Sequence, residues 1–279
     1  MSPRNSILCP NCRKLISEDE ERCPYCGLAS PGSFWKKNIL RRFTSGQADA
    51  VKWLIGINIA YYILSLVINP FLHQAQGNPL AFFSPSQGSL FILGASGSLP
   101  IGGYGRWWSL IAASFLHGGI LHLLFNMMAL WQLGYFVLRE YGLSRFIIIY
   151  IVAGAGGFFV SFIAGIYLTI GASASICGLI GSIIYYGKSR GGFYGESIYK
   201  QAMGWVIGLA VFGFIIPGIN NWAHGGGLLT GILISFLVGY QERNEEGFIH
   251  RAIASLCILL TAAALLWGLF QALSLLMQH

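Results

Sequence analysis

The sequence predicts an all-α polytopic membrane protein with a small cysteine-rich domain at its N-terminus. Of its 279 residues, 55% are hydrophobic and only 10% are charged, whereas soluble globular chains carry about 25% charged residues. Long apolar runs follow residue 52, and the first 50 residues are polar. This composition excludes a soluble enzyme, a nucleic-acid-binding domain and a disordered tail. No signal peptide is expected, because the polar N-terminus lacks a short apolar core.

Four of the six cysteines form two CxxC pairs near the N-terminus, Cys9-x2-Cys12 and Cys23-x2-Cys26, ten residues apart. Four thiolates at this spacing predict a structural zinc site, so residues 1–30 are expected to form a zinc ribbon. The segment is too short to fold on an apolar core, and the metal would supply its folding energy. Disulfides are the alternative, which a cytoplasmic location disfavours. A closed four-cysteine site leaves no position for substrate, so no catalytic cofactor is expected.

Residues 31–50 form a basic linker, and seven candidate membrane spans follow it. A helix needs about 20 apolar residues to cross a bilayer, and the fourth and sixth runs are somewhat short. The runs cover residues 53–72, 118–138, 145–168, 172–187, 201–218, 223–240 and 250–275.

The positive charges are sorted to one side of these spans. Nine of the 17 Lys and Arg residues precede residue 53, seven more lie in alternate connections, and Arg106 alone lies on the opposite side. This pattern predicts a cytoplasmic N-terminus and an outer C-terminus, in the cell (plasma) membrane. The loop 73–107 then lies at the outer interface. The net charge of +7 is explained by this sorting, so no nucleic-acid partner is expected.

Four polar residues lie where polar side chains are costly, inside predicted spans. His122 and Asn126 share one face of the second span, while Ser173 opens the fourth and His224 opens the sixth. All three helices run inward from the outer face, so these groups share one depth. Ser173 is expected about 8 Å below the outer boundary, from the rise of 1.5 Å per residue.

Small residues at four-residue spacing would let the fourth and sixth spans approach closely. They are Ala174, Gly178 and Ser182 on one span and Gly227, Gly231 and Ser235 on the other. Ser173 is then a candidate nucleophile and His224 its general base. No Asp or Glu occurs in any predicted span, so the pair would form a dyad. His122, Asn126 and the backbone N–H of Ser173 are candidate oxyanion donors.

Other interpretations compete with catalysis. A single membrane serine usually packs or bonds its own backbone, and a single membrane histidine often makes an interhelical hydrogen bond; their shared depth favours catalysis. A transporter that relays protons through His122 and His224 is a further hypothesis. The lack of membrane carboxylates and of an inverted repeat argues against it.

The motifs resemble those of the rhomboid intramembrane serine proteases, over residues 51–245. The family's His-x4-His-x3-Asn reads His117-Gly-Gly-Ile-Leu-His122-Leu-Leu-Phe-Asn126 here. Its Gly-x-Ser-Gly reads Gly171-Ala172-Ser173-Ala174, and its Ala-His-x2-Gly-x3-Gly reads Ala223-His224-Gly-Gly-Gly227-Leu-Leu-Thr-Gly231. The resemblance implies a six-helix core plus one C-terminal transmembrane helix (6+1), with residues 246–279 carrying the extra helix.

The resemblance also implies an endopeptidase that cuts transmembrane segments near the outer face. In that family the residues that correspond to Ser173 and His224 are catalytic. It further implies that His122 and Asn126 form the oxyanion hole and that His117 is structural. The fifth span, with Trp205, would gate substrate access, and a cytoplasmic partner for the zinc ribbon is a further expectation. The alternative within the family is an inactive protein that binds membrane clients.

The chain departs from the family pattern at several positions. Ala174 replaces the glycine after the serine, and Cys177 replaces an aromatic residue that often stacks on the histidine, for which Trp222 is a candidate substitute. Trp107-Trp108-Ser109 stands where the first loop often carries Trp-Arg, with Arg106 nearby.

Overall fold

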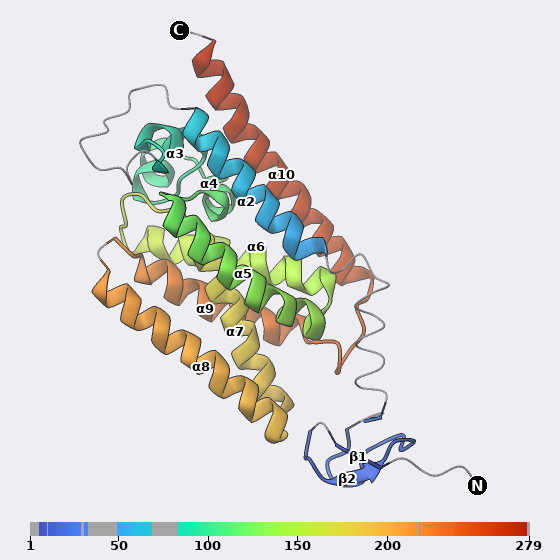
Figure 1. Cartoon of the computed structure of the whole chain (residues 1–279). Helices are drawn as coiled ribbons and strands as arrows, with labels where there is room; N and C mark the ends of the chain where they lie inside the picture. Colours follow the sequence, from blue (N-terminus) through green and yellow to red (C-terminus); the bar gives the residue numbers. More distant parts are fainter. Residues whose placement is uncertain are drawn as a thin grey trace.

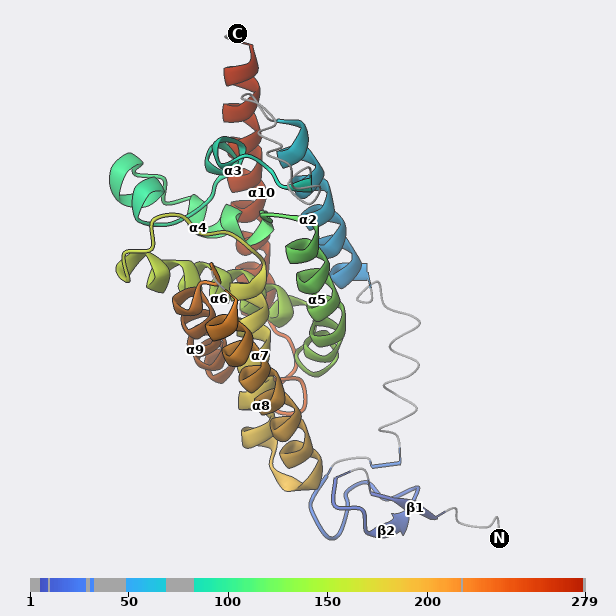
Figure 2. The same cartoon turned by 60° about the vertical axis from the view of Figure 1, so that its left-hand side comes forward.

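The computed structural model describes residues 6–9, 11–28, 31–32, 49–68, 83–216 and 218–277. In this part of the chain a bundle of long helices carries a small β-hairpin domain at one end (Figures 1 and 2). The long helices are α2 (Asp49–Val67), α5 (Ile120–Tyr141), α6 (Leu143–Ile163), α7 (Ser173–Arg190), α8 (Gly192–Ile215), α9 (Asn221–Val238) and α10 (Phe248–Leu276). Each of the seven predicted apolar runs therefore corresponds to a helix.

Helix α7 differs from the others because protein surrounds it. Six of the described helices, all of the long ones except α7, are long and apolar enough to cross a membrane. Twelve of the 18 residues of α7 are buried, and it contacts α5, α6, α8 and α9. Its small and polar residues lower its hydropathy, which is tolerated because neighbouring helices rather than lipid cover them.

The predicted starts and ends lie within a few residues of the helix ends except at α6, which ends at Ile163 rather than at residue 168, and at α8. This helix begins at Gly192 rather than at residue 201. Glu196 and Lys200 form an i,i+4 ion pair at 2.8 Å on its surface, which supports a helical turn that hydropathy alone does not detect. Helix α5 likewise extends to include Glu140. The end of the first predicted run, residues 69–72, and most of the basic linker lie outside the described residues.

The described part of the connection between α2 and α5 is largely helical. It contains α3 (Gln87–Leu93), a π-helical turn η3 (Leu99–Gly103), α4 (Ser109–Ala112) and a 3-10 turn η4 (Ala113–Phe115). Arg106 donates to the carbonyl of Phe91 and to Oε1 of Gln271 on α10, and its guanidinium lies 4.5 Å from the Phe91 ring centroid. Arg106 thus anchors the loop to α10, although it is not in the register of the family's Trp-Arg.

The hairpin domain consists of β1 (Ser6–Leu8) paired antiparallel with β2 (Leu15–Ser17). Among the residues that the structure describes, its core is formed by Cys9, Ile16 and Cys23, with a few partly buried neighbours. A core of this size does not stabilise a domain by apolar burial alone. The four thiols that meet in it are therefore central to its folding.

Candidate active site and metal centre

Two helix N-termini place a serine against a histidine inside the bundle. Ser173 is the first residue of α7, and His224 lies in the first turn of α9. The Oγ of Ser173 and the Nε2 of His224 are 2.8 Å apart, a hydrogen bond between residues 51 positions apart in sequence. This is the geometry that proton transfer from a serine hydroxyl to an imidazole requires.

Glycines on α9 make this approach possible. A Cβ atom on Gly227 would overlap the carbonyl oxygen of Ala174, and one on Gly231 would lie 2.5 Å from Cα of Gly178. Real side chains do not fit at such distances from a backbone. The two predicted small-residue ridges therefore meet, and their contact fixes His224 beside Ser173.

Asn220, which the sequence analysis did not single out, holds the start of α9 in place. Its Oδ1 accepts a hydrogen bond from the N–H of Ala223 as the N-cap of the helix. Its Nδ2 donates to Ser161 Oγ on α6 at 2.6 Å and to Thr169 Oγ1 at 2.8 Å. The asparagine immediately before an apolar periodic segment was the available signal.

His122 lies beside the segment that leads into Ser173. A Cβ atom on Gly171 would be 2.8 Å from His122 Nε2 and 3.7 Å from Ser173 Oγ, so all three groups border one small space. The N–H of Gly118 donates to His122 Nδ1 at 3.4 Å, which leaves the ring proton on Nε2, facing that space. The His117 ring packs edge-on against the His122 ring, with the two ring centroids 5.1 Å apart.

Asn126 is buried one turn below His122 on α5. Its Nδ2 donates to the carbonyl of His122 at 2.8 Å. One of the two amide protons is thus used within the helix, and this bond ties the Asn126 side chain to the backbone of His122.

The far side of the His224 ring has no partner. Its Nδ1 is buried without a hydrogen bond in the described structure, so the pair has no acidic third member here. Trp222 does not stack on His224, and this interpretation was wrong: Trp222 is 59% exposed, because residues two apart on a helix point in nearly opposite directions. Cys177 is buried on α7 and supplies no ring.

The four ribbon thiols form a compact cluster. All four Sγ atoms lie within 4.8 Å of one another, with Cys9 and Cys26 at 3.6 Å and Cys12 and Cys23 at 3.7 Å. A regular tetrahedral site with metal–sulfur bonds of about 2.3 Å requires sulfur–sulfur distances of about 3.8 Å. A disulfide requires about 2.05 Å, and all four thiols are free. The cluster therefore fits a metal such as zinc.

The ribbon thiols differ in acidity. Burial raises the pKa of Cys9 to about 12. Burial also acts to raise the pKa of Cys23, but the backbone N–H groups of Tyr25 and Cys26 and the neighbouring thiols outweigh it and lower this pKa to about 7. Metal binding would displace protons from the thiols of this cluster.

Comparison with known proteins shows the family of the chain. The family model for the rhomboid domain matches residues 104–241. Rhomboid protease GluP of Bacillus subtilis (strain 168) is 34% identical over 163 residues, which cover 58% of this chain and 32% of GluP. RHOMBOID-like protein 4 of Arabidopsis thaliana is 27% identical over 225 residues, covering 71% of this chain and 55% of that protein. Putative rhomboid protease YdcA of Bacillus subtilis (strain 168) is 34% identical over 142 residues, which are 50% of this chain and 71% of YdcA.

The chain belongs to the rhomboid family, and it is an integral multi-pass membrane protein. It spans about a third of GluP and just over half of RHOMBOID-like protein 4. The matched residues include the whole of α5 to α9, which carry the Ser173–His224 contact.

Proposed function

We propose that the protein is an intramembrane serine endopeptidase that cleaves transmembrane segments of other membrane proteins. The observation that carries this proposal is the 2.8 Å hydrogen bond between Ser173 Oγ and His224 Nε2. It joins two helices that each contribute one reacting group, inside a domain shared with proteins named as rhomboid proteases. A client-binding protein has no need of a paired nucleophile and base.

The dyad would work by covalent catalysis. His224 Nε2 takes the proton of Ser173 Oγ as the oxygen attacks the scissile carbonyl. The protonated imidazole then gives this proton to the leaving amine, which frees the C-terminal product and leaves an acyl ester on Ser173. Water, deprotonated by His224, hydrolyses the ester and restores the serine.

The oxyanion would form against the N-terminus of α7. Ala172 is the N-cap residue of this helix and makes no side-chain cap hydrogen bond, so its methyl group leaves the first-turn N–H groups uncapped. These N–H groups and the positive end of the helix dipole favour an anion beside Ser173. His122 Nε2 faces the same space. Asn126 is proposed as the further donor through its second amide proton.

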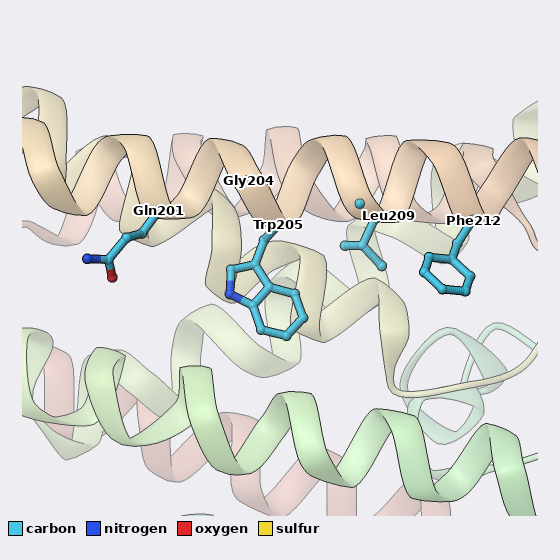
Figure 3. A pocket seen from close by; sticks show the side chains of 6 residues that line it. Gln201, Gly204, Trp205, Leu209 and Phe212 are labelled. Carbon is cyan, nitrogen blue, oxygen red and sulfur yellow. The ribbon is translucent and has the colours of Figure 1, made fainter.

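Substrate would reach the dyad past α8. Trp205, Leu209 and Phe212 project from one face of α8 toward the side on which α5 runs (Figure 3) and line a cavity of about 320 Å³. Their side chains would part or be displaced as a substrate segment enters. Because a helix hides its carbonyls in hydrogen bonds, the scissile segment must unwind, so substrates with Gly or Pro near a small residue are expected.

The remaining assignments follow from the charge pattern and the thiol cluster. We infer an N-terminus in the cytoplasm, a C-terminus outside and cleavage near the outer face of the plasma membrane. The domain division is a ribbon (1–30), a linker (31–50), the rhomboid core (51–245) and an added helix (246–279). The ribbon metal is proposed to be structural zinc, held by Cys9, Cys12, Cys23 and Cys26. A cytoplasmic protein partner for the ribbon stays a prediction.

The experiment is active-site labelling of the purified protein in detergent with a fluorophosphonate, followed by mapping of the modified residue. Ser173 should be labelled, and Ser173→Ala should abolish both labelling and cleavage of a transmembrane model substrate. His224→Ala should slow both by about 10²- to 10⁴-fold, the usual effect of losing a general base. Ser175→Ala is the matched control, because Ser175 is a buried serine of the same helix bonded to Ser114.

Labelling of Ser175 in place of Ser173, or cleavage that survives Ser173→Ala, would refute the dyad. A folded protein that neither reacts nor cleaves would favour the client-binding alternative. In that case Ser173→Ala should leave the biological effect of the protein intact.

A further inference from the structure

The ribbon touches the membrane bundle at one place, the turn that joins α7 to α8, among the residues described. Oδ1 of Asn11 accepts a hydrogen bond from Nη1 of Arg190, the last residue of α7, at 2.9 Å. Both views place the ribbon at this end of the bundle (Figures 1 and 2). Asn11 lies between the metal-site residues Cys9 and Cys12, so the contact comes from the first metal-binding knuckle.

The guanidinium of Arg190 is preorganised for this hydrogen bond, because its other nitrogen atoms and its face already make contacts within the bundle. Its Nε and Nη2 bind the two carboxylate oxygens of Glu242 at 2.7 and 3.1 Å, and it lies 4.6 Å from the Tyr194 ring centroid. Its side chain is only 5% exposed. Nη1 is thus presented to the ribbon in a fixed direction, which lowers the entropy cost of the hydrogen bond to Asn11.

Two further contacts complete the interface. The guanidinium of Arg13 lies 4.5 Å from the ring centroid of Phe193. A Cβ atom on Gly192 would lie 2.5 Å from Asn11 Oδ1, so the glycine, which also has a φ of +66°, lets the Asn11 amide rest against the turn. Every one of these contacts comes from the turn or from the segment around Cys12.

The contacted turn packs the start of α8 closely against the end of α7. Gly187 and Gly195 approach so closely that a Cβ atom on either would lie within 2.8 Å of the other's carbonyl oxygen. The far half of α8 exposes Phe214 at 85% and is tied to α9 by a hydrogen bond from Asn221 Nδ2 to the Gly213 carbonyl at 2.9 Å. A movement of α8 that opens this bond would pivot near the close contact at Gly195. Helix α8 carries the cavity-lining residues, and α7 carries the candidate nucleophile.

The ribbon can present Asn11 and Arg13 together only when its knuckle is folded. Arg13 has a φ of 58°, a left-handed conformation that a non-glycine residue holds only in a fixed turn. The turn is closed by the bond from Arg13 N–H to the Cys9 carbonyl at 2.9 Å. Metal ligation by the flanking thiols would hold this turn, since the apolar core is too small to do so.

We propose that the metal-loaded ribbon docks on the α7–α8 turn through Asn11 and Arg13 and thereby restrains the pivot of α8. The covalent tether keeps the ribbon at a high local concentration, so this small interface is sufficient for docking. The consequence for substrate access rests on the proposed protease function, whereas the docking itself does not.

The test is hydrogen–deuterium exchange of the backbone amides between residues 188 and 196 in the full-length protein, loaded with Zn²⁺ or stripped by a chelator. Chelation should speed their exchange by about tenfold, the order expected for losing a guanidinium hydrogen bond and a cation–π contact. The double variant Asn11→Ala, Arg13→Asn should exchange fast even with one zinc bound. Asparagine is chosen because it tolerates a left-handed turn. Lys14→Ala is the matched control, since Lys14 instead lies over the ribbon's own Tyr25 ring.

Equal exchange in the zinc-loaded wild type and the zinc-loaded double variant would overturn docking. If the double variant loses zinc, Phe193→Ala is used instead, because it removes the contact with Arg13 from the bundle side. Unchanged zinc-dependent protection of the turn in that variant would overturn the role of Arg13. Proteolysis is measured in parallel. If zinc protects the turn from exchange but Ser173 does not react, the proposed protease function alone is refuted. If the protein is active but zinc does not change the exchange of the turn, this inference alone is refuted.

Discussion

Asn220 offers the most direct test of how the site is held together, because one side chain joins α9, α6 and the segment before Ser173. Asn220→Ala removes an N-cap, which costs about 1 kcal/mol. It also removes two hydrogen bonds to Ser161 and Thr169, each worth about 0.6 kcal/mol on average within a membrane protein. The free energy of unfolding should therefore fall by about 2 kcal/mol.

The same change should slow labelling of Ser173. Because Asn220 positions the first turn of α9, its loss lets His224 leave the 2.8 Å contact. If the full 2 kcal/mol were lost at this contact, labelling would slow by up to about 30-fold. Asn220→Ser is the control: serine is a good N-cap but too short to reach Ser161 and Thr169, so it should recover about half of the lost stability.

Stability would be measured by SDS titration of the protein in mixed micelles, and reactivity by the rate of fluorophosphonate labelling. An Asn220→Ala variant within about 0.5 kcal/mol of wild type, a difference typical of neutral surface changes, would refute the energetic reasoning. A stability loss with an unchanged labelling rate would instead show that the capping bonds do not position His224.

Three other perturbations have defined outcomes. Gly231→Ala should separate α7 from α9 and abolish Ser173 labelling, because the added Cβ would lie 2.5 Å from Gly178 Cα. Gly225→Ala is the control: a Cβ there meets open space, so the labelling rate should be close to that of wild type. Arg106→Ala should lower the thermal midpoint and speed limited proteolysis of the outer loop, since it removes the tie to Gln271; unchanged cleavage would contradict this anchor. Zinc affinity, measured by competition with a chromophoric chelator, should fall as the pH falls, by about tenfold per unit for each thiol that must lose a proton. The sign follows because the metal-bound ribbon holds fewer protons than the free one, so its stability rises with pH; a pH-independent affinity would exclude ligation by the thiols.

The membrane class and the positions of the helices could be predicted because they depend on local composition. Apolar runs of the right length appear as helices whatever their neighbours are, and CxxC pairs bring thiols together through a few intervening residues. The start of α8 was missed because the Glu196–Lys200 pair is a surface contact that hydropathy treats only as two charges. Trp222 was misjudged because its side-chain direction depends on the phase of α9.

Residue types and their spacing along the chain identify the candidate groups for the chemistry: a serine and a histidine at helix starts, small residues at four-residue spacing, and four cysteines in two pairs. The packing of the helices, by contrast, is what brings Ser173 and His224 to 2.8 Å, places Asn220 against Ser161 and Thr169, and sets the ribbon's Asn11 on Arg190. The physical reason is that residue type and spacing are local properties of the chain. Contacts between residues 51 or 179 positions apart depend on how whole helices pack, and the glycines that permit that packing reveal their partners only once the backbones are in contact.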